Sequence, residues 1–194
     1  MKWPSRLSVR KADDDTLGEY DYGSKADAAL LHGEAVFDSD RIYRYRLSRE
    51  WLLGAGTCAF VMLNPSTADE RKLDPTVRRC VRFAQRWEFR RLEVVNLFAL
   101  RSTDPSALTK VPDPVGPENL GYIESVARKA DRVVVAWGKH GSVLGQGQKV
   151  AARLRAIGIE TWCFGLNSDG TPTHPLYQPN DSELIRFRPL WMDL

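Results

Sequence analysis

Residues 58–87 read CAFVMLNPSTADERKLDPTVRRCVRFAQRW, and this stretch decides the fold. It opens on a continuous apolar run rather than an alternating one, which is typical of a strand buried on both faces of a parallel sheet. Asp74 and Pro75 then form a helix start signal, and apolar residues from Val77 to Trp87 follow on one stripe. The stretch therefore predicts a strand, a loop and a helix.

Three further apolar runs, at residues 92–97, 132–137 and 160–164, repeat the strand pattern. Helical segments separate them: Pro117 opens one helix, and Ser142 is the expected cap of the next. Strands that alternate with helices form a parallel sheet with helices on its faces. We therefore predict a three-layer α/β/α sandwich with a central four-stranded parallel sheet.

The N-terminal part differs from this pattern. Residues 1–33 are polar and aperiodic, and we expect an N-terminal extension or arm. We expect residues 34–194 to form a single domain, a usual length for one. Within that domain, residues 35–37 and 42–47 predict an N-terminal antiparallel hairpin, whose second strand alternates tyrosines with arginines and so has one basic face.

Composition excludes several classes of protein. Cys58, Cys80 and Cys163 show no C-x-x-C spacing, which argues against a disulfide framework and against zinc or iron–sulfur sites. No stretch approaches ~20 apolar residues, and no signal-peptide pattern opens the chain. We expect a cytoplasmic monomer that contacts no membrane and needs no metal or organic cofactor.

The net charge of +3 is too small to indicate a nucleic-acid partner, but its distribution is uneven. Basic residues dominate residues 71–101, and four arginines lie within residues 41–49. An arginine-rich surface suits phosphate contacts. The alternative is a solvated helix face, which is what most runs of charge represent.

Ligands of open α/β sheets bind beyond the carboxyl ends of the strands, so the loops after the strands are the segments to consider. In the first loop, Asn64 follows a strand, and its amide can hold a water or read a base edge. Ser66 and Thr67 can donate to a phosphate, while an Asn-Pro turn is the alternative interpretation. In the second, Asn96 ends an apolar run, where an unpaired amide costs a few kcal/mol, so it has either a backbone partner or a ligand.

The remaining candidates lie in three loops. Arg101 and Ser102 form a phosphate-binding cluster, and Lys139 and His140 follow a glycine that allows close approach of a ligand. Trp137 is either a core residue or a stacking surface, and His140 is either a phosphate ligand or simply exposed.

His174, beside a proline, is the strongest catalytic candidate. A hydrogen bond from its ring to O2 of a pyrimidine stabilises negative charge on a departing base. Leu176 and Tyr177 can enter a duplex as a wedge in the gap left by an extruded base. A satisfied surface histidine is the alternative.

These landmarks identify a resemblance. Residues 43–177 resemble the family of uncharacterised proteins known as DUF1643, which shares NPSTAD at 64–69, DPT at 74–76, NLFALR at 96–101, AWG at 136–138 and HPLY at 174–177. That family is in turn similar to a branch of the uracil-DNA glycosylase superfamily. The resemblance implies a uracil-DNA glycosylase-like fold.

The resemblance also implies roles for individual residues. Asn64 matches the residue that positions the attacking water, Asn96 the base-reading asparagine, and His174 the histidine of the final motif, although two residues of that motif are missing here. Uracil-specific members have a tyrosine that blocks C5 substituents where this chain has Ser66. Phe98 is expected beside the base and Asp69 as an assisting carboxylate, whereas Asp74 is first of all a helix cap.

Together these observations predict a hydrolase, a DNA glycosylase that flips a modified pyrimidine out of DNA and cleaves its N-glycosidic bond. The DUF1643 resemblance implies a C5-substituted base such as glucosylated hydroxymethylcytosine, modified phage DNA as partner, and a role in antiviral defence. The predicted phosphate ligands are Thr67, Arg101, Ser102, Lys139 and His140. Two alternatives remain: a hydrolase of free modified nucleosides or nucleotides, and a non-catalytic binder of modified nucleic acid, since an asparagine activates water less well than an aspartate.

Overall fold

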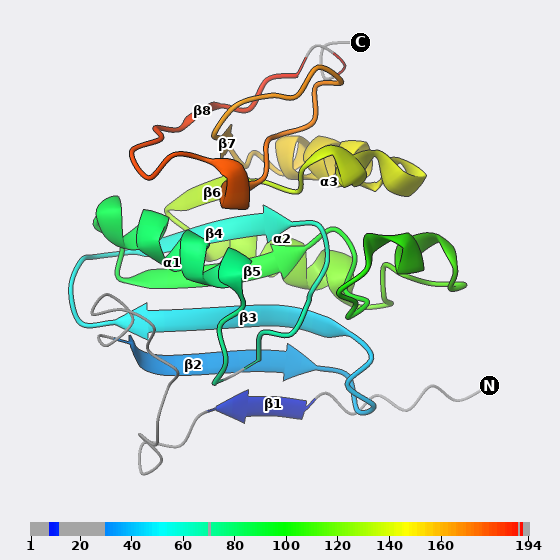
Figure 1. The fold of residues 1–194 in the computed structure, drawn as a ribbon, viewed down its shortest axis with the longest axis horizontal. Helices are drawn as coiled ribbons and strands as arrows, with labels where there is room; N and C mark the ends of the chain where they lie inside the picture. Colours follow the sequence, from blue (N-terminus) through cyan, green and yellow to red (C-terminus); the bar gives the residue numbers. More distant parts are fainter. Residues whose placement is uncertain (1–7, 12–29, 70, 190, 192–194) are drawn as a thin grey trace.

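A mixed β-sheet forms the centre of the computed structural model, which describes residues 8–11, 30–69, 71–189 and 191. The strands lie in the order β1-β2-β3-β5-β4-β6-β7-β8 (Figure 1). Their bounds are β1 Ser8–Lys11, β2 Leu30–Phe37, β3 Arg44–Trp51, β4 Thr57–Met62, β5 Arg91–Asn96, β6 Arg132–Val135, β7 Thr161–Cys163 and β8 Ile185–Arg186.

The neighbouring strands β5, β4, β6 and β7 pair in parallel, and they coincide with the apolar runs of the sequence. Strands β1, β2 and β3 extend one edge in antiparallel pairing, and β8 extends the other. The four parallel strands are therefore the middle of a larger mixed sheet, and the β2–β3 hairpin belongs to that same sheet.

Helices cover both faces of the sheet and give three layers. The helices are α1 Pro75–Arg86, α2 Asn119–Lys129 and α3 Gln146–Ala156. Phe60 of β4 packs in the cluster that contains the buried face of α1, whereas its neighbours Ala59 and Val61 pack with α2 and α3. The strands thus bury both faces, as their continuous apolar sequences predict.

The predicted start of α1 is confirmed, but that of α3 is wrong. Asp74 caps α1 by accepting a hydrogen bond of 2.8 Å from the Val77 N–H. Ser142 caps no α-helix; it lies in a 3₁₀ segment, Lys139–Gly145, that precedes α3. Its hydroxyl instead donates to the Lys139 carbonyl.

The N-terminal boundary also differs from the prediction. Strand β2 begins at Leu30, ahead of the expected boundary at residue 34, and β1 lies within the expected extension and pairs with β2. The other residues of that extension lie outside the described part of the chain. Within the described residues, no helix is long and apolar enough to cross a membrane.

A bulge in β3 corrects the prediction of one basic face. Val36 pairs with Arg46, but Phe37 pairs with Arg44, so Tyr45 is an extra residue on β3. Because side chains alternate along a strand, the extra residue turns Arg44 toward the α1 side, opposite to Arg46. Arg44 and Arg49 are both fully buried rather than exposed on a basic surface.

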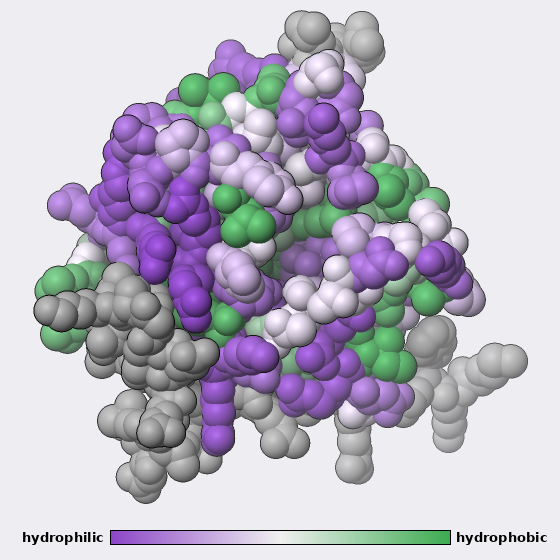
Figure 2. All heavy atoms as spheres, viewed as in Figure 1, coloured by the Kyte–Doolittle hydropathy of each residue, from purple (hydrophilic) through white to green (hydrophobic). Residues whose placement is uncertain are grey.

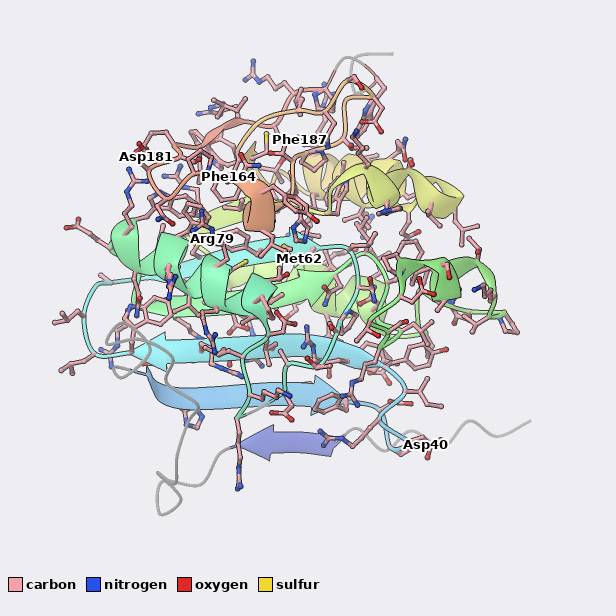
Figure 3. All side chains as sticks on the ribbon, in the orientation of Figure 1. Asp40, Met62, Arg79, Phe164, Asp181 and Phe187 are labelled. Carbon is pink, nitrogen blue, oxygen red and sulfur yellow. The ribbon has the colours of Figure 1, made fainter. Side chains whose placement is uncertain are left out.

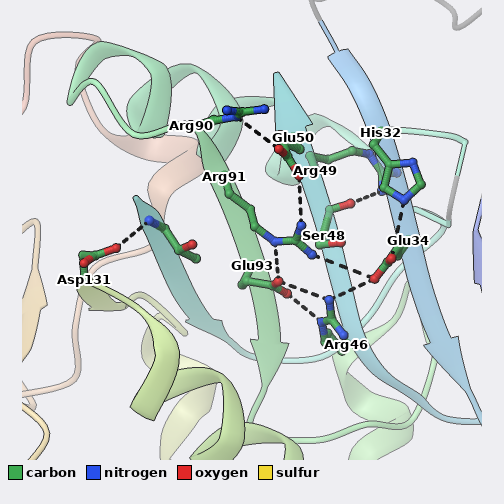
Figure 4. Close-up of polar contacts among 11 residues, drawn as sticks. His32, Glu34, Arg46, Ser48, Arg49, Glu50, Arg90, Arg91, Glu93 and Asp131 are labelled. Carbon is green, nitrogen blue, oxygen red and sulfur yellow. Dashed lines mark hydrogen bonds and ion pairs between the residues drawn. The ribbon is translucent and has the colours of Figure 1, made fainter. Parts of the chain in front are cut away.

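Arg46 lies in an ion-pair network across β2, β3 and β5 (Figure 4). It donates to Glu93 at 2.8 Å and to Glu34 at 3.0 Å. Arg91 bonds the same Glu93 at 2.7 Å and also reaches Glu50 at 3.1 Å. The charges on this face of the sheet therefore neutralise one another.

Candidate functional site

A cavity lies at the edge of the sheet where the parallel strands end. Its volume is about 480 Å³, within the ~300–1,000 Å³ range of small-molecule sites. Met62 at the end of β4, Asn96 at the end of β5 and Trp137 after β6 contribute to its wall, and Asp74 at the start of α1 closes one side. This face of the molecule is hollowed near its centre in Figure 2, and Figure 3 labels Met62 at the same place.

The three residues that the sequence identified as the centre of the site all line this one cavity. Asn64 follows β4, Asn96 ends β5, and His174 lies in the segment after β7. The strand order places β5, β4, β6 and β7 side by side, so these distant residues meet at one edge of the sheet.

Asn96 carries a buried amide without a partner. Its side chain is 1% exposed, and Nδ2 makes no hydrogen bond to any described residue. Two hydrogen bonds fix the backbone at this position, because Asn119 Nδ2 donates to the carbonyls of Asn96 and Leu97 at 2.9 and 3.0 Å. The sequence left two alternatives for this amide, a backbone partner or a ligand. No described residue provides a backbone partner for Nδ2, which favours a ligand.

Asn64 joins the first two loops. Its Nδ2 donates to the Ser102 carbonyl at 2.7 Å, and the Ser102 N–H donates to the Pro65 carbonyl at 2.9 Å. The amide nitrogen is therefore engaged, and the part of the side chain that these bonds leave unused is the acceptor oxygen Oδ1.

His174 has a defined tautomer. Its Nδ1 accepts a hydrogen bond from the Leu176 N–H at 3.3 Å, so in the neutral ring the proton is on Nε2. Burial lowers the pKa of His174, and the negative charge of Asp74 partly opposes this shift. The ring packs close to Gly138, where a Cβ atom would lie 3.4 Å from the His174 Cβ. The cavity thus holds a neutral imidazole with an N–H donor.

Arg44 is a cavity residue that no motif in the sequence indicated. This side chain is 2% exposed and lines the cavity, where its Nη1 donates to the Ala68 carbonyl at 2.7 Å. Its Nε has no hydrogen-bond partner among the described residues. Burial lowers the pKa of Arg44 to about 10, although Asp74 raises it in part. The bulge at Tyr45 places Arg44 here, and no pattern in the sequence signals that bulge.

Asp74 is the carboxylate that the cavity holds, and Asp69 is not. Asp74 is 7% exposed and lines the cavity. Asp69 lies outside it, and its Oδ1 accepts hydrogen bonds from the backbone of Arg71 and Lys72 at 2.9 and 2.8 Å. The expectation that Asp69 assists catalysis is corrected, since its carboxylate stabilises a turn.

Four other predicted site residues lie away from the cavity wall. Phe98 is fully buried in the core beneath the sheet, which excludes contact with a base. Thr67 is exposed outside the cavity, and Leu176 is exposed without lining it. Arg101 Nη1 donates to the Arg41 carbonyl at 3.1 Å, and its guanidinium stacks over the Phe37 ring, so these contacts serve the fold, while its Nε has no partner among the described residues.

The remaining predicted residues surround the cavity. Ser66 and Ser102 are half-buried in its wall, and Lys139 and His140 are exposed beside them. Tyr177 is 79% exposed, with its ring centre 5.8 Å from that of His174. The rim of the cavity is therefore polar, with one aromatic side chain, Tyr177.

Two arginines of the basic segment 71–101 fix the loop that carries His174. Arg79 Nε donates to the Pro175 carbonyl at 3.4 Å, and its Nη atoms bond Gln178 and Asn180. Arg86 bonds the carbonyls of Asn180 and Ser182. Arg79 belongs to α1, and its side chain reaches the segment after β7 (Figure 3). This part of the basic segment is therefore engaged inside the protein rather than free for phosphates.

Comparison with known proteins identifies the family. A family model described as a protein of unknown function, DUF1643, matches residues 44–176, more than half of the chain. The chain belongs to this family, and the matched residues include Arg44, Asn64, Asn96 and His174. No curated protein and no solved structure matches the chain. The likeness to uracil-DNA glycosylases finds no support in these comparisons.

Proposed function

We propose that this member of the DUF1643 family is a DNA glycosylase that hydrolyses the N-glycosidic bond of a C5-substituted pyrimidine. The observation that carries the proposal is the convergence of Asn64, Asn96 and His174 on one cavity of suitable size. Each presents a polar group that the described residues leave unused, as a site awaiting a polar ligand requires.

The reaction needs three things from the protein. The nucleotide is flipped out of the stack, the departing base carries negative charge, and a water attacks the sugar from the opposite face. His174 serves the second requirement, because a neutral imidazole donates Nε2–H to O2 of the base without giving up its proton.

Asn96 and Asn64 serve the other two requirements. The unpartnered Nδ2 of Asn96 donates to the Watson–Crick edge of the flipped base, which removes the cost of leaving this amide unpaired. The Oδ1 of Asn64 accepts a hydrogen bond from the attacking water and orients it, while Nδ2 keeps the side chain fixed through Ser102.

The cavity wall supports the proposal of a substituent at C5 of the base. Ser66 offers a small side chain where a large one would block C5, and the volume of about 480 Å³ accommodates a ring that carries a substituent. Glucosylated hydroxymethylcytosine is a base of this kind. Its occurrence in phage DNA gives antiviral defence as the proposed setting.

The rim supplies the DNA contacts in this proposal. Ser102, Lys139 and His140 lie beside the cavity mouth, where they are placed to bind the phosphates that flank the flipped nucleotide. Leu176 and Tyr177 are exposed on the adjacent loop and provide apolar surface to fill the vacated position in the duplex.

The test is an assay for abasic sites on end-labelled DNA that carries cytosine, uracil, 5-hydroxymethylcytosine or glucosylated hydroxymethylcytosine at one position. We expect abasic sites from the wild type on the substituted bases and a loss of about 100-fold or more in His174→Ala. His32→Ala is the matched control, because His32 lies in the ion-pair network far from the cavity and should leave the rate unchanged.

Each negative outcome selects another function. Binding of modified DNA without any abasic site would make the chain a non-catalytic binder. Base release from free nucleosides but not from DNA, with no dependence of binding on salt, would make it a nucleoside hydrolase, because DNA binding through phosphates weakens steeply with salt.

A further inference from the structure

Arg44 is a buried cation that the scheme above does not use. It lines the cavity, and its Nε–H has no partner in the described part of the chain. A buried charged donor left unpaired is unfavourable, and Arg49 and Arg101 add repulsion from nearby positive charges. Because Arg44 also lines the cavity, a ligand bound there can supply the missing acceptor.

The strand order separates the elements that carry Arg44 and His174, and Asp74 interacts electrostatically with both side chains. Arg44 belongs to β3, Asn96 to β5 and Asn64 to the end of β4, and His174 follows β7 on the far side. Taken in the order of the strands, the groups that line the cavity are therefore a guanidinium, two amides and an imidazole. If His174 contacts O2 of a pyrimidine and Asn96 contacts its Watson–Crick edge, Arg44 faces the edge formed by C4 and C5.

The chemistry of Arg44 and Asp74 indicates which chemical group binds next to them in the cavity. Arg44 offers a donor, and Asp74 lies close enough to interact with it electrostatically. Asp74 Oδ1 caps α1, and its second oxygen takes no part in that cap. A hydroxyl group is both a donor and an acceptor, so a guanidinium beside a carboxylate satisfies it fully.

We propose that Arg44, with Asp74 beside it, is the specificity-determining residue that selects a pyrimidine with a hydroxyl-bearing C5 substituent. This inference rests on the proposed function for the orientation of the base. It adds to that function the residue that distinguishes a hydroxylated substituent from an apolar one of similar size.

Arg49 provides a matched control. It lies on the same strand and is as deeply buried, and like Arg44 it donates to carbonyls of the loop after β4, at Asp69 and Lys72. It does not line the cavity. If Arg44 merely supports that loop, substitutions of the two arginines should have the same consequences.

The experiment compares DNA with 5-hydroxymethylcytosine and DNA with 5-methylcytosine, which differ by one hydroxyl. Single-turnover rates are measured for the wild type, Arg44→Gln, Arg44→Lys and Arg49→Gln, with thermal unfolding as a check of folding. We expect the wild type to prefer the hydroxylated base, and the preference to fall by about 10-fold or more in Arg44→Gln. Arg44→Lys keeps the charge without the planar fork and should retain part of the preference, whereas Arg49→Gln should retain all of it.

A second readout separates failure of this inference from failure of the proposed function. Calorimetry measures binding of 5-hydroxymethyl-2′-deoxycytidine and 5-methyl-2′-deoxycytidine to the same variants. Cleavage with an equal preference in the wild type and both Arg44 variants overturns the inference alone. Absence of cleavage, with selective nucleoside binding that Arg44→Gln abolishes, overturns the glycosylase proposal and supports Arg44. Absence of both cleavage and selective binding overturns both.

Discussion

Arg44 and Arg46 are close together on β3, yet they point to opposite faces of the sheet and have different surroundings. Burial disfavours the charge of both. At Arg46 the hydrogen bonds and charges of Glu93 and Glu34 outweigh burial and raise its pKa, whereas at Arg44 burial dominates and lowers the pKa to about 10. Arg46, paired with two glutamates, stabilises the sheet, whereas Arg44, whose Nε has no partner among the described residues, lines the cavity and is where we propose a ligand contact.

Two buried asparagines show the same contrast. Asn119 Nδ2 is used fully, by two backbone carbonyls, whereas Asn96 Nδ2 is used by none of the described residues. Both amides are deeply buried. For these two amide nitrogens, the presence of a partner rather than burial separates the residue that holds the fold from the one that lines the cavity, while Oδ1 of Asn119 also has no partner among the described residues.

The asparagines give the largest expected effect. Asn96→Ser should lower the glycosylase rate by about 100-fold, and should leave the free energy of unfolding nearly unchanged, because it removes an amide that nothing satisfies. Asn119→Ala should instead destabilise the protein by about 1–3 kcal/mol, because it removes two hydrogen bonds and leaves the Leu97 carbonyl with only its bond from Gln146. Single-turnover kinetics and urea unfolding check the pair, and equal destabilisation by both would break the contrast.

Glu93 tests the paired face of the sheet. Glu93→Gln weakens the pairs with both Arg46 and Arg91, so it should destabilise the protein by about 1–3 kcal/mol in urea unfolding and leave activity on DNA unchanged. Glu124→Gln weakens an exposed pair with Arg153 and should have a smaller effect. A loss of activity in Glu93→Gln without loss of stability would contradict the structural role assigned to this network.

Arg79 has both roles. Its hydrogen bonds hold the fold together, and they also position the loop that carries the cavity residue His174. Arg79→Ala should reduce the rate by about 10-fold, because a shift of His174 by a fraction of an ångström weakens its contact with the base. Arg79→Lys should recover part of the rate, and Arg86→Ala should reduce it less, since Arg86 bonds residues further along the loop. The expected signature is a fall in kcat with little change in KM.

The smallest expected effect is a pH dependence from His174. Its pKa is lowered in the fold, so below about pH 6.5 the unfolded chain binds more protons than the native protein, and stability falls with falling pH. Protonation also places a hydrogen on Nδ1, which then no longer accepts from Leu176 N–H. Activity should be level through neutral pH and decline on the acid side, at a pH below the ordinary range for histidine. His174→Asn should remove this slope in unfolding measurements, and an alkaline decline instead would contradict a neutral donor.

The sequence predicted the site where local pattern determines position. Asn64 and Asn96 follow apolar strands, and the rule that ligands bind at the carboxyl ends of parallel strands brought them together with His174. The sequence did not predict positions that depend on one inserted residue in a strand or on contacts between segments far apart in the chain. The bulge at Tyr45 turned Arg44 into the cavity, and the contacts of Arg79 reach a loop far along the chain.

One measurement tests the central claim most directly: the NMR signals of the side-chain amides of Asn96 and Asn119, assigned through Asn96→Ser and Asn119→Ala, during titration with free 5-hydroxymethylcytosine base. The unpaired amide of Asn96 should shift as it gains its partner, while the paired amide of Asn119 should stay in place. An unmoved Asn96 signal at saturating base, or equal shifts of both amides, would contradict the account.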